Sequence, residues 1–146
     1  MPSFYQKTIK REIQFKGVGL HNGKEVNMKL VPAAPNHGIV FKRTDLKTKN
    51  LIPAIFNNVS KAVLCTNIQN EFGITVSTIE HLMGALHGEE IDNLLVEIDS
   101  SEVPIMDGSA KEFVCQIRKV GTRDYDTSKK FIRVLKKCEL VIDKKF

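Results

Sequence analysis

An adjacent acid and imidazole, Glu80 and His81, are the side chains of this sequence best suited to catalysis. Apolar residues recur around them at helical spacing: Val76, Ile79, Leu82, Met83 and Leu86. Because a helix turns by about 100° per residue, these residues form one stripe, with Glu80 at its edge and His81 outside it. In a one-metal hydrolase such an imidazole holds zinc, and the carboxylate takes a proton from the water that the metal activates.

The same residues also have a purely structural interpretation. Ser77 followed three residues later by Glu80 is a capping box, which predicts a helix that starts near Ser77. Taken alone, the local spacing favours this cap over a catalytic pair. His87 cannot join His81 on a metal ion, because six residues place the two side chains roughly 120° apart on a helix. Any co-ligands of His81 must therefore come from elsewhere.

Length and composition limit the possible classes of protein. A chain of 146 residues with 42% apolar content is long enough for one well-buried core and too short for two ordinary domains. The three cysteines are an odd number without a C-x-x-C pair, which indicates neither a disulfide framework nor a cysteine zinc site. We expect a soluble cytoplasmic protein with no signal peptide and no transmembrane segment, since no stretch approaches the roughly 20 apolar residues of a membrane span.

The net charge of +5 is concentrated near the end of the chain. From Arg118 onward there are ten basic and four acidic residues, a net charge of +6, so the remainder carries −1. A nucleic-acid surface would more typically be a basic face interleaved with aromatic residues. We therefore expect a solvated, lysine-rich tail and no nucleic-acid partner.

Alternating apolar residues predict a series of strands, which occupy these ranges: Lys7–Phe15, Val26–Leu30, Ile39–Phe41, Ala62–Ile68 and Leu94–Ile98. Pro53 favours an edge strand or a loop over Leu51–Phe56. The glycines between Gly17 and Gly23 predict a turn that lines a site. Ser109 is a helix cap, followed by a second amphipathic stripe at Phe113, Val114, Ile117 and Val120.

The last part of the chain differs from the rest. Residues 122–130 are polar and have no periodicity, which predicts a linker. Two strand-like runs follow, Phe131–Leu135 and Glu139–Ile142, with no helix after them to cover an apolar face. Residues 131–146 are therefore expected to be the opening strands of a truncated second domain.

Taken in order, six short motifs resemble one family, the zinc-dependent UDP-3-O-acyl-N-acetylglucosamine deacetylases of lipid A synthesis in Gram-negative bacteria. The motifs are Gly17-Val18-Gly19-Leu20-His21, Arg43-Thr44-Asp45-Leu46, Leu64-Cys65-Thr66, Ser77-Thr78-Ile79-Glu80-His81-Leu82, Gly88 with Ile91-Asp92-Asn93, and Ile105-Met106-Asp107-Gly108-Ser109-Ala110. They span most of the chain from Thr8 to Val120. The order of six motifs is far more specific than any one of them.

The resemblance implies a fold and a reaction. Family members have two similar domains with the metal site between them, so residues 1–121 are expected to be the first, an α+β two-layer sandwich with one mainly antiparallel sheet backed by two helices. Glu80 would be the general base and His81 a ligand of Zn²⁺. The reaction would remove the N-acetyl group of a UDP-linked acylated glucosamine. Five residues match segments that border the substrate: Leu20, His21, Leu64, Cys65 and Thr66.

The resemblance also implies that part of the site is missing. The family's other zinc ligands and most of its nucleotide pocket belong to the second domain, and a catalytic zinc normally needs three protein ligands. We therefore predict that the 146-residue chain alone has no deacetylase activity. Two alternatives remain: a non-enzymatic α/β module that binds RNA or serves in assembly, and a packing domain that pairs with a second copy of itself.

Overall fold

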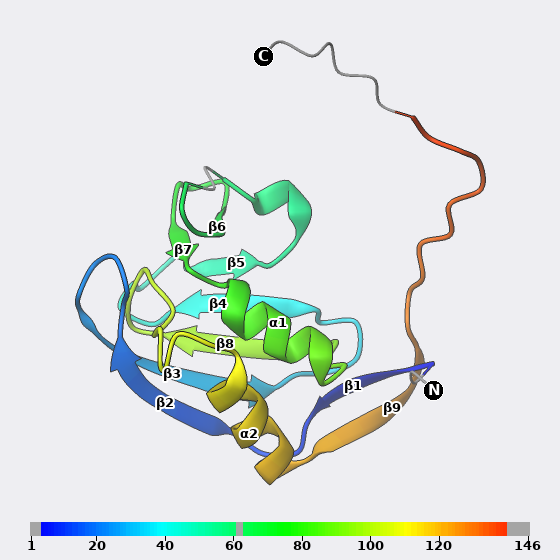
Figure 1. Ribbon diagram of the computed structural model, residues 1–146, viewed down its shortest axis with the longest axis horizontal. Helices are drawn as coiled ribbons and strands as arrows, with labels where there is room; N and C mark the ends of the chain where they lie inside the picture. Colours follow the sequence, from blue (N-terminus) through cyan, green and yellow to red (C-terminus); the bar gives the residue numbers. More distant parts are fainter. Residues whose placement is uncertain (1–3, 61–62, 140–146) are drawn as a thin grey trace.

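A five-stranded sheet forms the body of the protein in a computed structural model that describes residues 4–60 and 63–139 (Figure 1). In spatial order its strands are β2 (Ile13–Val18), β3 (Glu25–Pro32), β8 (Leu94–Ile98), β4 (Ile39–Arg43) and β5 (Leu51–Pro53). Only β8 and β4 pair in parallel, and the other three pairings are antiparallel. The predicted α+β class with a mainly antiparallel sheet is confirmed.

Two helices, α1 (Glu80–Gly88) and α2 (Lys111–Val120), cover one face of this sheet (Figure 1). They contact each other, and α2 also packs on β2. The edge of one aromatic ring meets the other where Phe113 of α2 packs against Phe15 of β2, with ring centroids 5.1 Å apart. The predicted two-layer sandwich, one sheet backed by two helices, is confirmed.

Alternation of side chains explains the central strands. Val26, Met28 and Leu30 of β3 all point into the core, and the inward residues of β8 do the same, because successive side chains of a strand point to opposite faces. On the outer face, Glu97 of β8 forms ion pairs with Lys29 and Lys42. The strands predicted at Val26–Leu30, Ile39–Phe41 and Leu94–Ile98 are confirmed.

A separate two-stranded ribbon joins the two ends of the domain. β1 (Tyr5–Ile9) pairs antiparallel with β9 (Thr122–Ser128). The predicted linker is therefore wrong for residues 122–128, which form a strand with few buried positions and hence no clear periodicity. The single strand predicted for Lys7–Phe15 is also wrong, because the chain turns at residues 10–12 and passes from this ribbon into the main sheet.

A second ribbon carries the segment that leads into α1. It consists of β6 (Asn67–Gln69) and β7 (Thr75–Ser77), and it follows the short 3-10 helix η1 (Phe56–Asn58). The buried strand predicted for Ala62–Ile68 is wrong: Leu64 has a positive φ of 63° and is 91% exposed, so the chain turns there. Residue 62 lies outside the described residues.

Helix α1 starts three residues later than predicted. Thr78 has a φ of 56°, which is incompatible with a right-handed helix, so the helix begins only at Glu80. The predicted capping box is not formed: the Ser77 hydroxyl donates to the Ser101 carbonyl, and Glu80 accepts a hydrogen bond from Thr66. The N-cap of α2 is Ala110 and not the predicted Ser109, although Oγ of Ser109 accepts a hydrogen bond of 3.1 Å from the Lys111 backbone N–H at the start of the helix.

Residues 131–139 leave the body of the domain in irregular, exposed conformation (Figure 1). The strand predicted at Phe131–Leu135 is wrong in this structure, because no described strand lies beside it. Most of the run predicted at Glu139–Ile142 lies outside the described residues. Within the described ranges, no helix combines the length and the apolar character needed to span a bilayer.

Candidate active site

The first turn of α1 carries Glu80 and His81, both half-buried. The backbone N–H of Thr66 donates a hydrogen bond of 3.0 Å to Oε2 of Glu80. This contact links α1 to the loop before β6, which lies 14 residues earlier in the chain. The hydrogen bond holds Oε2 of the carboxylate, and no described residue donates a hydrogen bond to Oε1.

Glu80 lies in the wall of an open pocket of about 370 Å³. Apolar side chains dominate the lining, which is formed by Ala54, Ile55, Phe56, Val59, Thr66, Ile68, Ile79, Glu80 and Met83. Of the three residues predicted to face the site from the segment 64–66, Thr66 lines the pocket, whereas Leu64 and Cys65 do not. A carboxylate at the edge of an apolar pocket can act on a substrate that combines a polar group with a hydrophobic chain.

The imidazole of His81 has one ring nitrogen without a hydrogen-bond partner among the described residues. This nitrogen, Nδ1, is buried. Because buried polar atoms are normally paired, an unpartnered ring nitrogen beside Glu80 fits the binding of a metal ion. In residues 4–60 and 63–139, however, no three His, Cys, Asp or Glu side chains come together to hold one. The described part of the chain therefore brings together fewer than three candidate ligands at this point.

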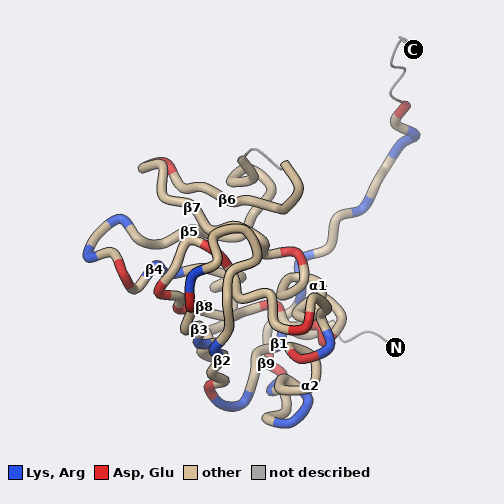
Figure 2. The backbone as a smooth tube through the Cα atoms, turned by 60° about the vertical axis from the view of Figure 1, so that its left-hand side comes forward, with Lys and Arg blue, Asp and Glu red and all other residues tan. Residues whose placement is uncertain are grey.

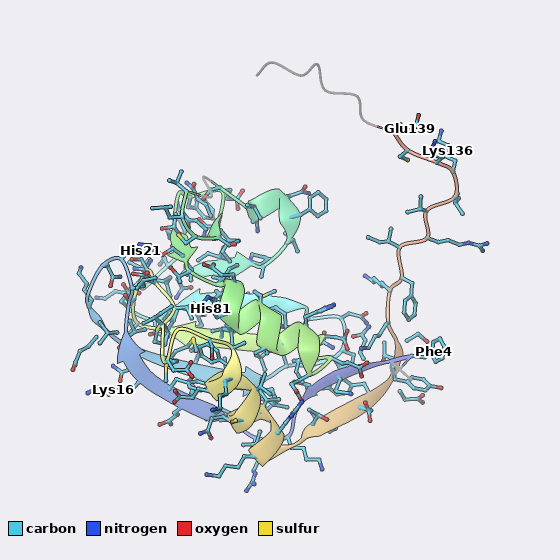
Figure 3. The ribbon with its side chains drawn as sticks, viewed as in Figure 1. Phe4, Lys16, His21, His81, Lys136 and Glu139 are labelled. Atoms are coloured by element: carbon cyan, nitrogen blue, oxygen red, sulfur yellow. The ribbon has the colours of Figure 1, made fainter. Side chains whose placement is uncertain are left out.

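The loop between β2 and β3 lies at the same end of the domain as the start of α1. Figure 3 labels His21 in this loop and His81 in the first turn of the helix. Leu20 and His21 are both exposed. A buried carboxylate connects the two segments: Glu102 accepts a hydrogen bond from the His21 backbone N–H at 3.0 Å and one from the Thr78 hydroxyl at 2.8 Å.

Glu102 is an ionisable group that the sequence analysis missed. Burial by itself raises the pKa of its carboxyl, but the hydrogen bonds from His21, Asn22 and Thr78 outweigh this effect and bring the pKa below its ordinary value. A signal was present in the sequence. Ser100 and Glu102 continue the inward-facing series of β8 at intervals of two residues, so an acidic side chain occupies a core-facing position.

The other predicted substrate-facing residues are placed less closely to Glu80. Cys65 is half-buried and carries a free thiol, and Leu64 is almost fully exposed. Among the described residues, neither lines the pocket that contains Glu80, and the same holds for Leu20 and His21. The structure thus brings Thr66 to the catalytic candidate directly, whereas the loop at Leu20 and His21 is connected to it through Glu102.

Comparison with known proteins identifies the family. The family model LpxC, described as UDP-3-O-acyl N-acetylglycosamine deacetylase, matches residues 6–146. The chain belongs to the LpxC family. A relative from Haemophilus influenzae, named UDP-3-O-acyl-N-acetylglucosamine deacetylase, is 46% identical over 129 residues, which cover 88% of this chain and 42% of the relative. One of the same name from Actinobacillus succinogenes is 48% identical over 135 residues, covering 92% and 44%. The chain spans less than half the length of these LpxC relatives.

Two of the motifs that resemble the LpxC family have structural roles in this chain. Arg43 forms a bidentate ion pair with Asp45 and donates a hydrogen bond of 2.9 Å to the Thr75 carbonyl, which ties the end of β4 to β7. This ion pair lowers the pKa of Asp45. Asn93 is buried and bonds Gln6 and the backbone of Gly38. Both motifs position strands and do not reach the pocket.

Basic and acidic side chains alternate over the described part of this LpxC chain. Figure 2 shows Lys and Arg interspersed with Asp and Glu over the body, and several basic residues along the extended segment after β9. Part of the basic charge is paired, as in Lys7 with Glu90 and Lys129 with Asp92. This distribution gives the alternative of an RNA-binding module no support from the described residues.

Proposed function

We propose that this chain supplies the general base and one zinc ligand of a deacetylase that hydrolyses the N-acetyl amide of a UDP-linked, acylated glucosamine in lipid A synthesis. The observation that carries the proposal is the pair Glu80 and His81 on one helical turn, with Glu80 in a pocket wall and His81 with an unpartnered ring nitrogen. The names of the relatives supply the reaction.

Glu80 would move the proton. The N–H of Thr66 holds Oε2, and Oε1, to which no described residue donates a hydrogen bond, would accept a proton from the attacking water. Glu80 then gives that proton to the nitrogen of the amide that is cleaved, which leaves as an amine while acetate is released. A zinc ion held by His81 and further ligands would supply polarisation of the amide carbonyl and a lower pKa of the attacking water.

His81 would be one ligand of that zinc ion. Three protein ligands are usual at a catalytic zinc, and the described residues bring no three together. The remaining ligands would come from the part of the LpxC relatives that this chain does not span. On this basis we propose that the 146-residue chain alone is inactive. A reducing, cytoplasmic location is consistent with its free cysteines.

The apolar pocket beside Glu80 supports a substrate with a hydrocarbon portion. Ile55 and Phe56 line this pocket and are 51% and 84% exposed. Neighbouring exposed apolar side chains are typical of a ligand-binding groove. The acyl chain of the substrate, attached to the sugar beside the amide that is cleaved, would cover these two side chains.

The test joins this chain to the residues of the Haemophilus influenzae relative that follow its matched segment, giving the completed protein. We expect the completed protein to release acetate from the UDP-linked substrate, and the 146-residue chain to release none. Glu80→Gln keeps the shape of the side chain but removes the base, and should lower kcat by about 10²–10⁴-fold. Glu71→Gln, at an exposed position, is the matched control and should retain full activity. Acetate release that survives Glu80→Gln would contradict the proposal.

A further inference from the structure

Glu102 is a buried charge with an unusual set of partners. It is 1% exposed, and no described Lys, Arg or His forms an ion pair with it. Its two oxygens are held instead by the backbone N–H groups of His21 and Asn22, at 3.0 and 2.9 Å, and by the hydroxyl of Thr78, at 2.8 Å. A buried charge is unfavourable unless such donors compensate it. The donors come from two segments more than 50 residues apart in sequence.

One of these segments contains a strained residue, Thr78, two positions before Glu80. Thr78 has a φ of 56°, in the left-handed region that a β-branched residue rarely adopts, and it is 3% exposed. Strained backbone persists only where the surroundings hold it. Here the neighbouring Ser77 donates its N–H to the Ser101 carbonyl, while the side chain of Glu102 binds the Thr78 hydroxyl. This strained conformation determines where α1 begins, and so where Glu80 lies.

The other segment wraps closely around the same carboxylate. A Cβ atom at Gly19 would lie 2.6 Å from Oε2 of Glu102 and 2.3 Å from Oδ1 of Asn22, so a larger residue at this position would displace one of these side chains or the loop. The loop is closed by a hydrogen bond from the Gly23 N–H to the Gly19 carbonyl. Its backbone is therefore shaped around Glu102, and Leu20 and His21 project from it.

We infer that Glu102 is a positioning residue for the catalytic pair. Its carboxylate holds Thr78 against the loop of residues 19–22, and this contact fixes the first turn of α1 relative to the wall that the loop provides. Glu102 itself touches neither substrate nor metal. The inference rests on the proposed function. It adds Glu102, which lies outside the six motifs and has no role in the proposed reaction.

Glu102→Gln tests the inference in the completed protein. Glutamine keeps the size of the side chain but replaces one acceptor oxygen by an NH₂ group, which cannot bind the N–H of His21 or Asn22. Small displacements of catalytic groups reduce turnover strongly, so we expect kcat to fall by about 10–100-fold with KM changed by less than about threefold. Glu97→Gln is the matched control, because Glu97 lies on the outer face of β8 with Lys29 and Lys42. It should leave kcat unchanged.

A second pair of variants covers the case that Glu102→Gln does not fold. Thr78→Val replaces the hydroxyl by a methyl group and should lower kcat in the same way, whereas Thr78→Ser keeps the hydroxyl and should retain kcat. Rescue by serine distinguishes positioning from a packing role, since serine fills the space less well than valine. A kcat for Glu102→Gln or Thr78→Val within about threefold of the unaltered protein, after correction for the folded fraction, would overturn the inference.

A measurement independent of activity separates this inference from the proposed function. In the 146-residue chain, Glu102→Gln should shift the amide NMR signals of residues 19–22 and 78–81 and leave those of β3 and β4 unchanged. If the completed protein has no deacetylase activity, the proposed function fails, and the amide signals still decide the positioning role. Signals of residues 78–81 that do not move would overturn it.

Discussion

The close contact between Gly19 and Glu102 leads to a quantitative prediction for Gly19→Ala. The new methyl group would lie 2.6 Å from Glu102 Oε2 and 2.3 Å from Asn22 Oδ1. Because three donors hold Glu102, the loop must move instead. Overpacking of this kind costs about 1–3 kcal/mol. Displacement of Asn22 would also break its hydrogen bond from the Lys24 N–H, worth about 1 kcal/mol. We expect the free energy of unfolding to fall by about 2–4 kcal/mol.

Gly84→Ala is the matched control for this substitution. Gly84 lies inside α1, and an added Cβ meets no atom within 4 Å. Alanine in a helix interior is more stable than glycine by about 0.5–1 kcal/mol, so this variant should be stabilised. Urea unfolding of the 146-residue chain, followed by far-ultraviolet circular dichroism, measures both variants. With a slope of about 2 kcal/mol per molar urea, the midpoint for Gly19→Ala should fall by about 1–2 M. A midpoint equal to that of the unaltered chain would refute the close packing of the loop on Glu102.

Three further predictions follow from other contacts. The pKa of Glu102 is lower in the folded chain than its ordinary value of 4.5. The stability that the ionised carboxylate contributes is therefore present above pH 4.5 and is lost as the pH falls below that value. The urea midpoint of Glu102→Gln should consequently fall less in acid than that of the unaltered chain. A chain that ends at Lys130 should unfold at the same urea midpoint as the unaltered chain. A chain that ends at Gly121 lacks β9, so its free energy of unfolding should be lower by at least about 2 kcal/mol. Equal midpoints for the two shortened chains would contradict the β1–β9 pairing. Arg43→Lys should cost about 1–2 kcal/mol in thermal or urea unfolding, because lysine cannot make the bidentate contact, and the exposed control Arg133→Lys should cost nothing measurable.

Local patterns were sufficient for the strands and helices whose side chains alternate between core and solvent. β3 and β8 have regular inward positions, and α2 has an apolar stripe, so each could be predicted from its own residues. The strand β9 could not, because only Thr122, Tyr125 and Thr127 are even half-buried and its stability comes from pairing with β1. A strand at the edge of a small ribbon leaves almost no hydrophobic signal.

The segments around the candidate site were hardest to predict for a different reason. Leu64 and Thr78 adopt positive φ values, which neither a leucine nor a β-branched residue favours, so local propensity pointed to a strand and to an early helix start. Tertiary contacts from Glu102 hold Thr78 in this conformation. The sequence singles out Glu80 and His81 as candidates by residue type, whereas the positioning role that we propose for Glu102 depends on contacts between distant segments.

The proposed roles of Glu80 as general base and of His81 as zinc ligand are tested most directly by the zinc content of the completed protein. We expect Glu80→Gln to retain zinc in equimolar amount after dialysis while losing activity, and His81→Ala to lose both. His37→Ala, in an exposed turn, is the control and should retain both. Zinc is measured by inductively coupled plasma mass spectrometry on the dialysed proteins. Loss of zinc from His81→Ala alone is the result the account predicts, and a His81→Ala protein with the full zinc content would contradict it.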